Sequence, residues 1–183
     1  MDAYVYLRIE PGKLHEVQAG LATKSQLNRA VVVVGAWDML VHVEGSDLAT
    51  IATQVLSDIH HVPGVRRTLT TPVVPPDRVG IAGWGAPDPP PMVGDVCYVH
   101  IKCEAGAAAG LAERLGEMSE VSGVAVLAGD YDLLACVAQP WEVASGIIME
   151  EIHPLPGVVD TNTLVSIHYE EPEEDRDQFS AWT

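Results

Sequence analysis

A four-residue stretch that occurs twice, as Gly129-Asp130-Tyr131-Asp132 and earlier as Gly35-Ala36-Trp37-Asp38, organises the whole chain. Short runs rich in small and β-branched residues flank each copy, such as residues 30–34 and 39–43 around the first. Two β-rich runs around a Gly/Asp segment are typical of a hairpin, because glycine adopts the positive φ of a turn and aspartate bonds local backbone amides. Each stretch is therefore predicted to be a hairpin tip, either a turn and nothing more or part of a binding site.

The sequence around the first tip predicts a small α+β unit. Residues 4–9 alternate between two faces as a strand does, and residues 13–24 place apolar side chains at helical spacing. A second helical segment follows Ser46 or Asp47, either of which is a good N-cap, and the Thr- and Val-rich run 65–74 is expected to be the last strand. The order β-α-β-β-α-β is that of a ferredoxin-like domain.

The same order begins again at residue 96, so the chain contains an internal repeat. An offset of 94, which becomes 93 after one deleted residue, carries Tyr4 onto Tyr98, Gly35 onto Gly129, Asp38 onto Asp132 and His60 onto His153. We therefore expect two domains, 1–74 and 96–169, joined by a Pro/Gly-rich linker, 75–95. The acidic end, 170–183, is expected to be a disordered tail, either solvated or partner-binding.

One face of each predicted sheet is left uncovered by its own helices. In the first strands this face carries Tyr4 and Tyr6, and then Tyr98 and His100. These side chains are too apolar for a face in water and too polar for a plain core, which favours an interface. The predicted fold class is thus α+β, with two ferredoxin-like βαββαβ domains packed sheet to sheet as an intrachain pseudo-dimer of the dimeric α+β barrel type.

Charge and composition exclude several functions. Ten Lys and Arg against 26 Asp and Glu give a net charge of −16, which disfavours direct binding to nucleic acid or to an anionic membrane. No apolar run approaches the ~18 residues of a membrane span, so a cytoplasmic protein is expected. Cys97, Cys103 and Cys136 are odd in number and have no C-x-x-C spacing, which predicts free thiols.

The order of motifs resembles the ligand-binding domain of the Lrp/AsnC transcriptional regulators, also called the RAM domain. The shared succession is a Tyr-Val strand, Glu-Pro-Gly, a helix, the Gly-Asp-Tyr-Asp hairpin, a second helix, Pro-Gly-Val and a Thr-x-Thr strand. The resemblance covers about residues 3–74 and 96–169. It implies an effector-sensing domain, duplicated in tandem and without the helix-turn-helix DNA-binding domain of the family.

The resemblance also implies where an effector, usually an amino acid, would bind: near the tips, between assembled domains. Carried over by motif, the implied ligand-binding residues are Gly35, Trp37, Asp38, Gly129, Tyr131 and Asp132, with Thr68, Thr70, Thr161 and Thr163 from the last strands. Backbone amides at a glycine tip can receive a carboxylate, an aspartate can hold an ammonium, and an aromatic ring can cover a side chain. The first copy departs from the pattern at Ala36 and Trp37, so two inequivalent pockets and one working pocket both remain open.

Catalytic and metal-binding motifs are not found. There is no Gly-x-Ser-x-Gly, no P-loop and no dinucleotide fingerprint, so we expect no enzyme and no cofactor. His42 and His100 lie on predicted strands without a second ligand at metal-like spacing, so no metal site is predicted. His60, His61 and His153 follow predicted helices, where imidazoles can bond the last carbonyls.

Three hypotheses follow for function. The leading one is an effector-binding and oligomerisation protein of transcriptional-regulator type that binds an amino acid or related small metabolite. It would assemble into homo-oligomers or into mixed rings with DNA-binding relatives. By fold analogy alone, the chain could instead be a haem- or tetrapyrrole-binding protein or enzyme with His100 or His42 as axial ligand. The third hypothesis is a purely architectural partner of full-length regulators.

Overall fold

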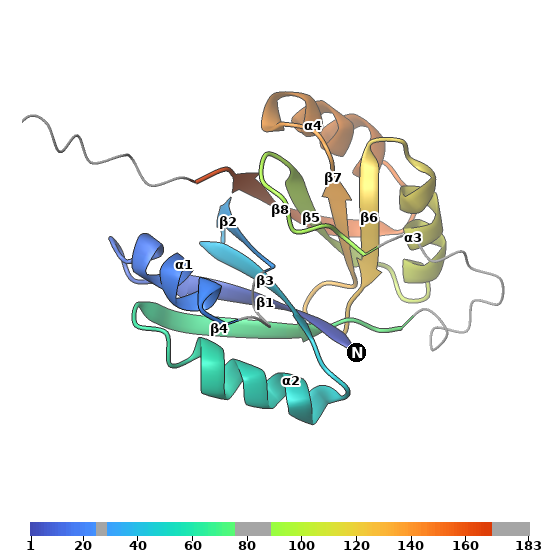
Figure 1. The fold of residues 1–183 in the computed structure, drawn as a ribbon. Coiled ribbons are helices and arrows are strands. Elements are labelled where there is room, and N and C mark those ends of the chain that lie inside the picture. The colour runs from blue at the N-terminus through green and yellow to red at the C-terminus, as the bar shows by residue number, and fades with distance from the viewer. Residues whose placement is uncertain (25–28, 76–88, 170–183) are drawn as a thin grey trace, which may run out of the picture.

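The computed structural model describes residues 1–24, 29–75 and 89–169, which form two halves with the same order of elements (Figure 1). The first half contains β1 (Asp2–Ile9), α1 (Leu14–Ala22), β2 (Ala30–Val34), β3 (Met39–Glu44), α2 (Leu48–Gln54) with its π-helical continuation η1 (Val55–Ile59), and β4 (Val65–Pro72). The second half contains β5 (Cys97–Cys103), α3 (Ala108–Glu117), β6 (Val121–Val126), β7 (Leu133–Val137), α4 (Trp141–Ile147) with η3 (Ile148–Ile152), and β8 (Val158–Ile167). The predicted acidic tail and most of the linker lie outside the described residues.

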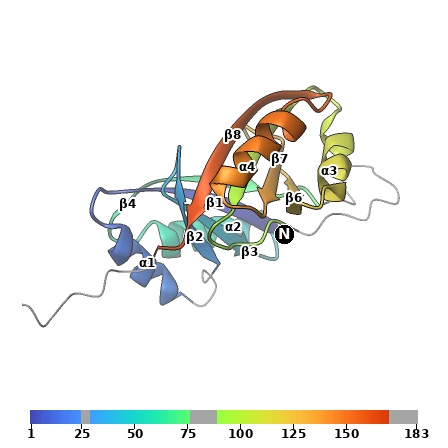
Figure 2. The ribbon, with the colours of Figure 1, turned by 90° about the horizontal axis from the view of Figure 1, so that it is seen from above.

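All eight strands form one sheet in the order β4-β1-β3-β2-β8-β5-β7-β6. The halves join where β2 pairs with β8 in antiparallel register, for instance Val33 with Ser166 (Figure 2). The two end strands also meet, through a bridge between Val73 and Leu127 and a 2.8 Å bond from Val74 N–H to the Val126 carbonyl. The sheet therefore closes on itself, and the predicted fold of two ferredoxin-like halves packed sheet to sheet is confirmed.

Side chains on the two faces of the sheet form separate cores. On the outer face, helices α1 and α2 cover the first half and α3 and α4 cover the second (Figure 1). On the inner face, residues from both halves share one cluster that includes Tyr4, Tyr6 and Tyr98, and Tyr4 and Tyr98 are fully buried. Burial of this shared apolar cluster inside the closed sheet holds the halves together.

Turn glycines explain why the last strand begins at the same place in both halves. Gly64 and Gly157 both have a φ of +96°, and a Cβ there would lie 2.7 Å from Lys13 Cβ and Ala107 Cβ respectively. Glycine is thus required where each last strand begins against the first helix. Of the two predicted N-caps, Asp47 is the one that caps α2, because its carboxylate accepts the Thr50 N–H at 2.8 Å.

The end of the linker packs onto the barrel interior. Tyr98 Oη donates to the Pro91 carbonyl at 2.7 Å and accepts from Val93 N–H at 3.0 Å. At the equivalent place in the first half, Tyr4 Oη donates to the Pro90 carbonyl at 3.4 Å. Two interior tyrosines thus fix the path of the linker into β5.

Two further expectations concern cysteines and membranes. Cys97, Cys103 and Cys136 are free thiols, as predicted. Within the described residues, no helix has the length and the apolar character that crossing a membrane requires.

Candidate functional site

Four aromatic rings form a row across the inside of the barrel, from one hairpin tip to the other. Ring centroids are 5.9 Å apart from Trp37 to Tyr6, 5.1 Å from Tyr6 to His100, and 5.3 Å from His100 to Tyr131. The row obeys the internal repeat, because Trp37 is equivalent to Tyr131 and Tyr6 to His100. Both tips therefore contribute to one place in the molecule.

The centre of the row is a neutral hydrogen-bonded pair. His100 is 5% exposed, and its burial lowers its pKa to about 4, so the imidazole is uncharged at neutral pH. Its Nδ1 lies 3.2 Å from the Asn162 carbonyl, which can only accept, so Nδ1 carries the proton and donates. Nε2 then accepts from the Tyr6 hydroxyl at 2.7 Å. Burial raises the pKa of Tyr6, which keeps the phenol protonated.

A cavity of about 190 Å³ lies beside this row. The four rings line it together with Arg67, Leu69 and Thr71 of β4, Ala36 of the first tip, Leu127 and Asp130 next to the second, and Asn162 of β8. The walls are mostly apolar and aromatic with a few polar groups, which is the usual composition of a small-molecule site.

Opposite charges stand at the two ends of the cavity. The Arg67 guanidinium lies 5.7 Å from the centre of the Trp37 ring, within the range of a cation–π contact. At the other end, burial raises the pKa of Tyr131, and the nearby carboxylates of Asp160 and Asp130 raise it further. Asp160 is the repeat equivalent of Arg67, so the duplication places a cation at one end and an anion at the other.

Of the tip residues that the sequence singled out, Trp37 and Tyr131 line the cavity. Both tip aspartates bond the backbone of the first strand of their own half. Asp38 Oδ2 accepts from Ile9 N–H at 2.8 Å, and Asp132 Oδ2 accepts from Cys103 N–H at 2.7 Å. Each carboxylate therefore ties its hairpin tip to the end of the neighbouring strand.

The tip glycines pack against the other half of the molecule. A Cβ on Gly35 would lie 2.9 Å from Leu164 Cδ2, and a Cβ on Gly129 would lie 2.8 Å from Thr71 Cγ2. Leu164 and Thr71 are themselves repeat equivalents. The glycines thus allow each tip to approach the last strand of the opposite half.

The four predicted threonines lie on the helix-covered face of the sheet and not at the cavity. The hydroxyls of Thr68 and Thr161 bond Nε2 of His60 and His153, each at 2.7 Å. These two histidines therefore bond threonines of the last strands, and not the helix carbonyls as the sequence suggested. Thr70 and Thr163 pair with Val5 and Val99, which belong to the outer cores.

Sequence reasoning missed the cavity residues of the last strands, which are Arg67, Leu69, Thr71 and Asn162. Successive side chains point to opposite faces of a strand, so a one-residue error exchanges the faces. The sequence did contain a signal for these positions. Leu69 and Thr71 alternate with the predicted threonines, and by the repeat they are equivalent to Asn162 and Leu164 of β8, whose side chains point inward.

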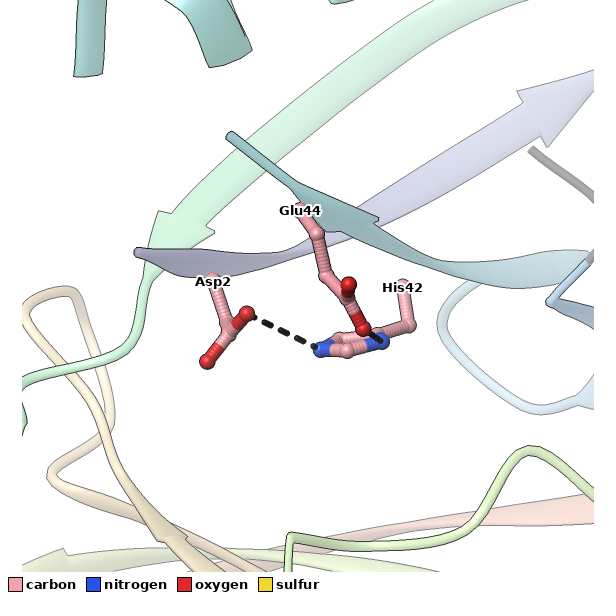
Figure 3. Close-up of side chains that lie close together, drawn as sticks. All are labelled: Asp2, His42 and Glu44. Atoms are coloured by element: carbon pink, nitrogen blue, oxygen red, sulfur yellow. Dashed lines mark ion pairs between the residues drawn. The ribbon is translucent and has the colours of Figure 1, made fainter. Parts of the chain in front are cut away.

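A second polar cluster involves His42, for which spacing along the sequence offered no companion ligand. The pairing of β1 with β3 places Asp2 opposite Glu44 and Tyr4 opposite His42. His42 Nε2 is 3.9 Å from Asp2 Oδ1, and Nδ1 is 3.8 Å from Glu44 Oε1 (Figure 3). Asp2 is 40 residues from His42 in sequence, so only the strand register brings it close, whereas Glu44 lies two residues after His42 on the same strand.

Comparison with known proteins gives a match over most of the chain. A model of the Lrp/AsnC ligand binding domain matches residues 2–75 and again 96–176. The chain is similar to FFRP-DM1 with 28% identity and a TM-score of 0.36, covering 38% of this chain and 92% of that one. For AsnC of E. coli the identity is 16% and the TM-score 0.38, covering 68% of this chain and 72% of that one. No curated protein sequence gives a match.

Siroheme decarboxylase NirDL, in complex with an iron-uroporphyrin III analogue, resembles both halves together. Its TM-score is 0.65 at 11% identity, over 92% of this chain and 71% of that one. An identity this low shows a shared fold alone. The match nevertheless overturns the expectation that the chain is not an enzyme, because NirDL has the same fold and is an enzyme. The lack of short catalytic motifs therefore does not exclude an enzymatic function.

Proposed function

Because the chain belongs to the Lrp/AsnC ligand binding domain family, we propose that it binds a small effector in the cavity between its two hairpin tips. The proposed effector is an amino acid or a related metabolite that carries both charges. The observation that supports this proposal is the charge arrangement, with Arg67 at one end of a mostly apolar cavity and Asp130 at the other. The chain would act as the sensing part of a transcriptional regulator.

Each group of the effector has a counterpart in the cavity. The Arg67 guanidinium suits a carboxylate, and the carboxylates beside Tyr131 suit an ammonium. Trp37 and Tyr131 offer apolar walls for a side chain, and the neutral Tyr6–His100 pair closes the site from inside. Both tips converge on this one cavity, so we propose one effector for each chain.

A thermal-shift screen against amino acids and related metabolites tests the proposal. A ligand at 100 times its Kd adds about 2.7 kcal/mol to the free energy of unfolding, and each kcal/mol raises the Tm of a chain this size by about 2–4 °C. Arg67→Gln should abolish the shift. Arg66→Gln is the matched control, because Arg66 is an exposed arginine next to Arg67 in β4 that does not line the cavity. The proposal fails if no such compound shifts the wild-type midpoint, or if both variants respond alike.

We also propose that the chain assembles into homo-oligomers, or into mixed oligomers with DNA-binding relatives. Exposed apolar residues recur at equivalent places on the second helix of each half: Leu48 and Trp141, and Leu56 and Met149. Such paired patches suit an interface between chains. Light scattering after size exclusion should give more than one chain per particle, and Leu56→Lys with Met149→Lys should reduce that number. A monodisperse monomer for the wild type would contradict this.

The second candidate function is tetrapyrrole binding, which the fold shared with NirDL and the buried His100 support. Both nitrogens of His100 already have partners, Tyr6 and Asn162, so an axial bond would have to displace one of them. Incubation with haem or an iron-uroporphyrin tests the candidate directly. A Soret band that stays with the protein through gel filtration and disappears in His100→Ala would favour it over the effector site.

A further inference from the structure

The Asp2, His42 and Glu44 cluster combines two features that are each unfavourable alone. Asp2 and Glu44 stand directly opposite each other on antiparallel strands, where like charges repel. The imidazole of His42 lies between the two carboxylates (Figure 3). The side chains of Asp2 and Glu44 are 44% and 58% exposed, whereas that of His42 is 7% exposed.

One nitrogen of His42 has no hydrogen bond. Among the described residues, Nε2 is buried without a partner, and Asp2 Oδ1 at 3.9 Å is beyond hydrogen-bond range. Nδ1 is 3.5 Å from Arg29 Nη1 and 3.8 Å from Glu44 Oε1. Buried polar atoms in proteins nearly always have a partner, so the bare Nε2 aimed at Asp2 indicates a missing one.

The contact with Arg29 indicates which nitrogen of His42 carries the proton. A guanidinium can only donate, so Nδ1 accepts from Arg29 Nη1 and Nε2–H faces Asp2 without an acceptor in range. For a metal ion to bind Nε2, the proton moves to Nδ1, and Nε2 then offers the lone pair that coordinates a metal ion.

We propose that Asp2, His42 and Glu44 bind one divalent transition-metal ion, such as Zn²⁺. One donor atom from each residue lies within 4.8 Å of the other two. Tetrahedral Zn²⁺ with bonds of about 2.0–2.2 Å needs donors about 3.4 Å apart, and rotation of the two exposed carboxylates closes the difference. An imidazole with carboxylates suits Zn²⁺ or Mn²⁺ better than Mg²⁺ or Ca²⁺, which prefer oxygen ligands alone.

Arg29 does not exclude the ion. Its Nη1 donates to Glu44 Oε1 at 2.5 Å. A carboxylate has two oxygens, so Glu44 can accept from Arg29 and coordinate a metal at the same time, as metal-bound carboxylates commonly do. Arg29 would then orient Glu44 toward the site.

The second half of the chain cannot form this site. The repeat equivalents of Asp2, His42 and Glu44 are Val96, Cys136 and Ala138, so neither carboxylate is present there. The proposal therefore requires a single ion for each chain. This stoichiometry separates it from weak binding at the many other surface carboxylates.

The test is a titration of tag-free, metal-stripped full-length protein with Zn²⁺ by calorimetry and with Co²⁺ by visible absorption. We expect one ion per chain. Asp2→Asn combined with Glu44→Gln should lower the affinity by about tenfold or more, and His42→Gln should do the same and alter the Co²⁺ spectrum. The double variant changes only exposed side chains, so it keeps the test valid if His42→Gln does not fold.

His61→Gln is the matched control, because it removes an exposed histidine elsewhere. It should leave both the affinity and the stoichiometry unchanged. The proposal is overturned if neither ion binds in the micromolar range, if several ions bind with similar affinity, or if the double variant binds as tightly as the wild type. None of these results depends on the effector cavity.

Discussion

Tyr6 Oη and His100 Nε2 lie 2.7 Å apart, although the two residues occupy equivalent positions in the two halves of the chain. The hydrogen bond forms because the two side chains differ: the Tyr6 phenol donates and the neutral His100 imidazole accepts. His100 in turn is oriented by the Asn162 carbonyl. This contact fixes the inner wall of the proposed effector site.

Tyr6→Phe should lower the free energy of unfolding by about 1–3 kcal/mol, because it leaves the buried His100 Nε2 without a partner. Urea denaturation at pH 7.5 measures the change. Tyr169→Phe removes the hydroxyl of a tyrosine that is 40% exposed, and it should change the stability by less than about 0.5 kcal/mol. Equal losses in both variants would mean that the interior bond contributes nothing.

Stability should fall with pH between about 6.5 and 4 because of His100. Its pKa in the folded protein is about 4, below the ordinary value of 6.5, so the unfolded chain binds more protons in this window. The contribution is therefore complete above pH 6.5 and is lost as the pH falls, at up to about 1.4 kcal/mol per pH unit. Unfolding free energies at pH 7.5 and pH 5 give the slope, and it should be shallower in His100→Gln. Equal slopes in the wild type and in His100→Gln would contradict this assignment.

Asp132→Ala should destabilise the protein by about 1–3 kcal/mol, since the Cys103 N–H would lose its acceptor. Asp38→Ala should behave similarly through Ile9 N–H. Asp130→Ala is the control, as this neighbouring aspartate is exposed. Chemical denaturation distinguishes the roles: Asp130→Ala should preserve stability and weaken effector binding, whereas an unchanged stability in Asp132→Ala would show that its backbone bond is dispensable.

Alanine substitutions should rank the two tip glycines. Gly35 has a φ of +145°, and a Cβ there would also lie 3.2 Å from the Thr163 carbonyl, so Gly35→Ala is strained in conformation and in packing. Gly129→Ala meets only the Thr71 side chain and should cost less. Gly110→Ala, in α3 with open space around it, should instead raise the stability by about 0.5–1 kcal/mol. Thermal denaturation of the three variants tests this order.

Tyr98→Phe should loosen the linker without unfolding the barrel. The hydroxyl bonds Pro91 and Val93, so its loss should speed hydrogen exchange at the Val93 amide. Exchange in the core amides of β5 should stay slow. If the Val93 amide exchanges at the wild-type rate, the tyrosine does not hold the linker in solution.

The fold could be predicted because its local signals occur twice. Turn glycines and alternating strands match between the halves, so each copy supports the interpretation of the other. The pairing of β2 with β8 and the bridge from Val73 to Leu127 could not be predicted. Such contacts depend on how the two halves pair with each other, and no short stretch of sequence encodes that.

The candidate site could be predicted only in part. The tip aromatics Trp37 and Tyr131 were identified because the motif repeats, and they line the cavity. The tip aspartates Asp38 and Asp132 bond backbone amides of the neighbouring strands, and their role toward a ligand stays a prediction. Arg67 was missed because its importance depends on a side chain from the first hairpin tip, Trp37, whose ring centre lies 5.7 Å from the guanidinium.

The Asp2–His42–Glu44 cluster has no counterpart at Val96, Cys136 and Ala138. In a dimer of identical subunits, every substitution occurs twice, once on each side of the symmetry axis. The two halves of one polypeptide can differ in sequence, so one half can carry a site that the other lacks while both keep the same fold.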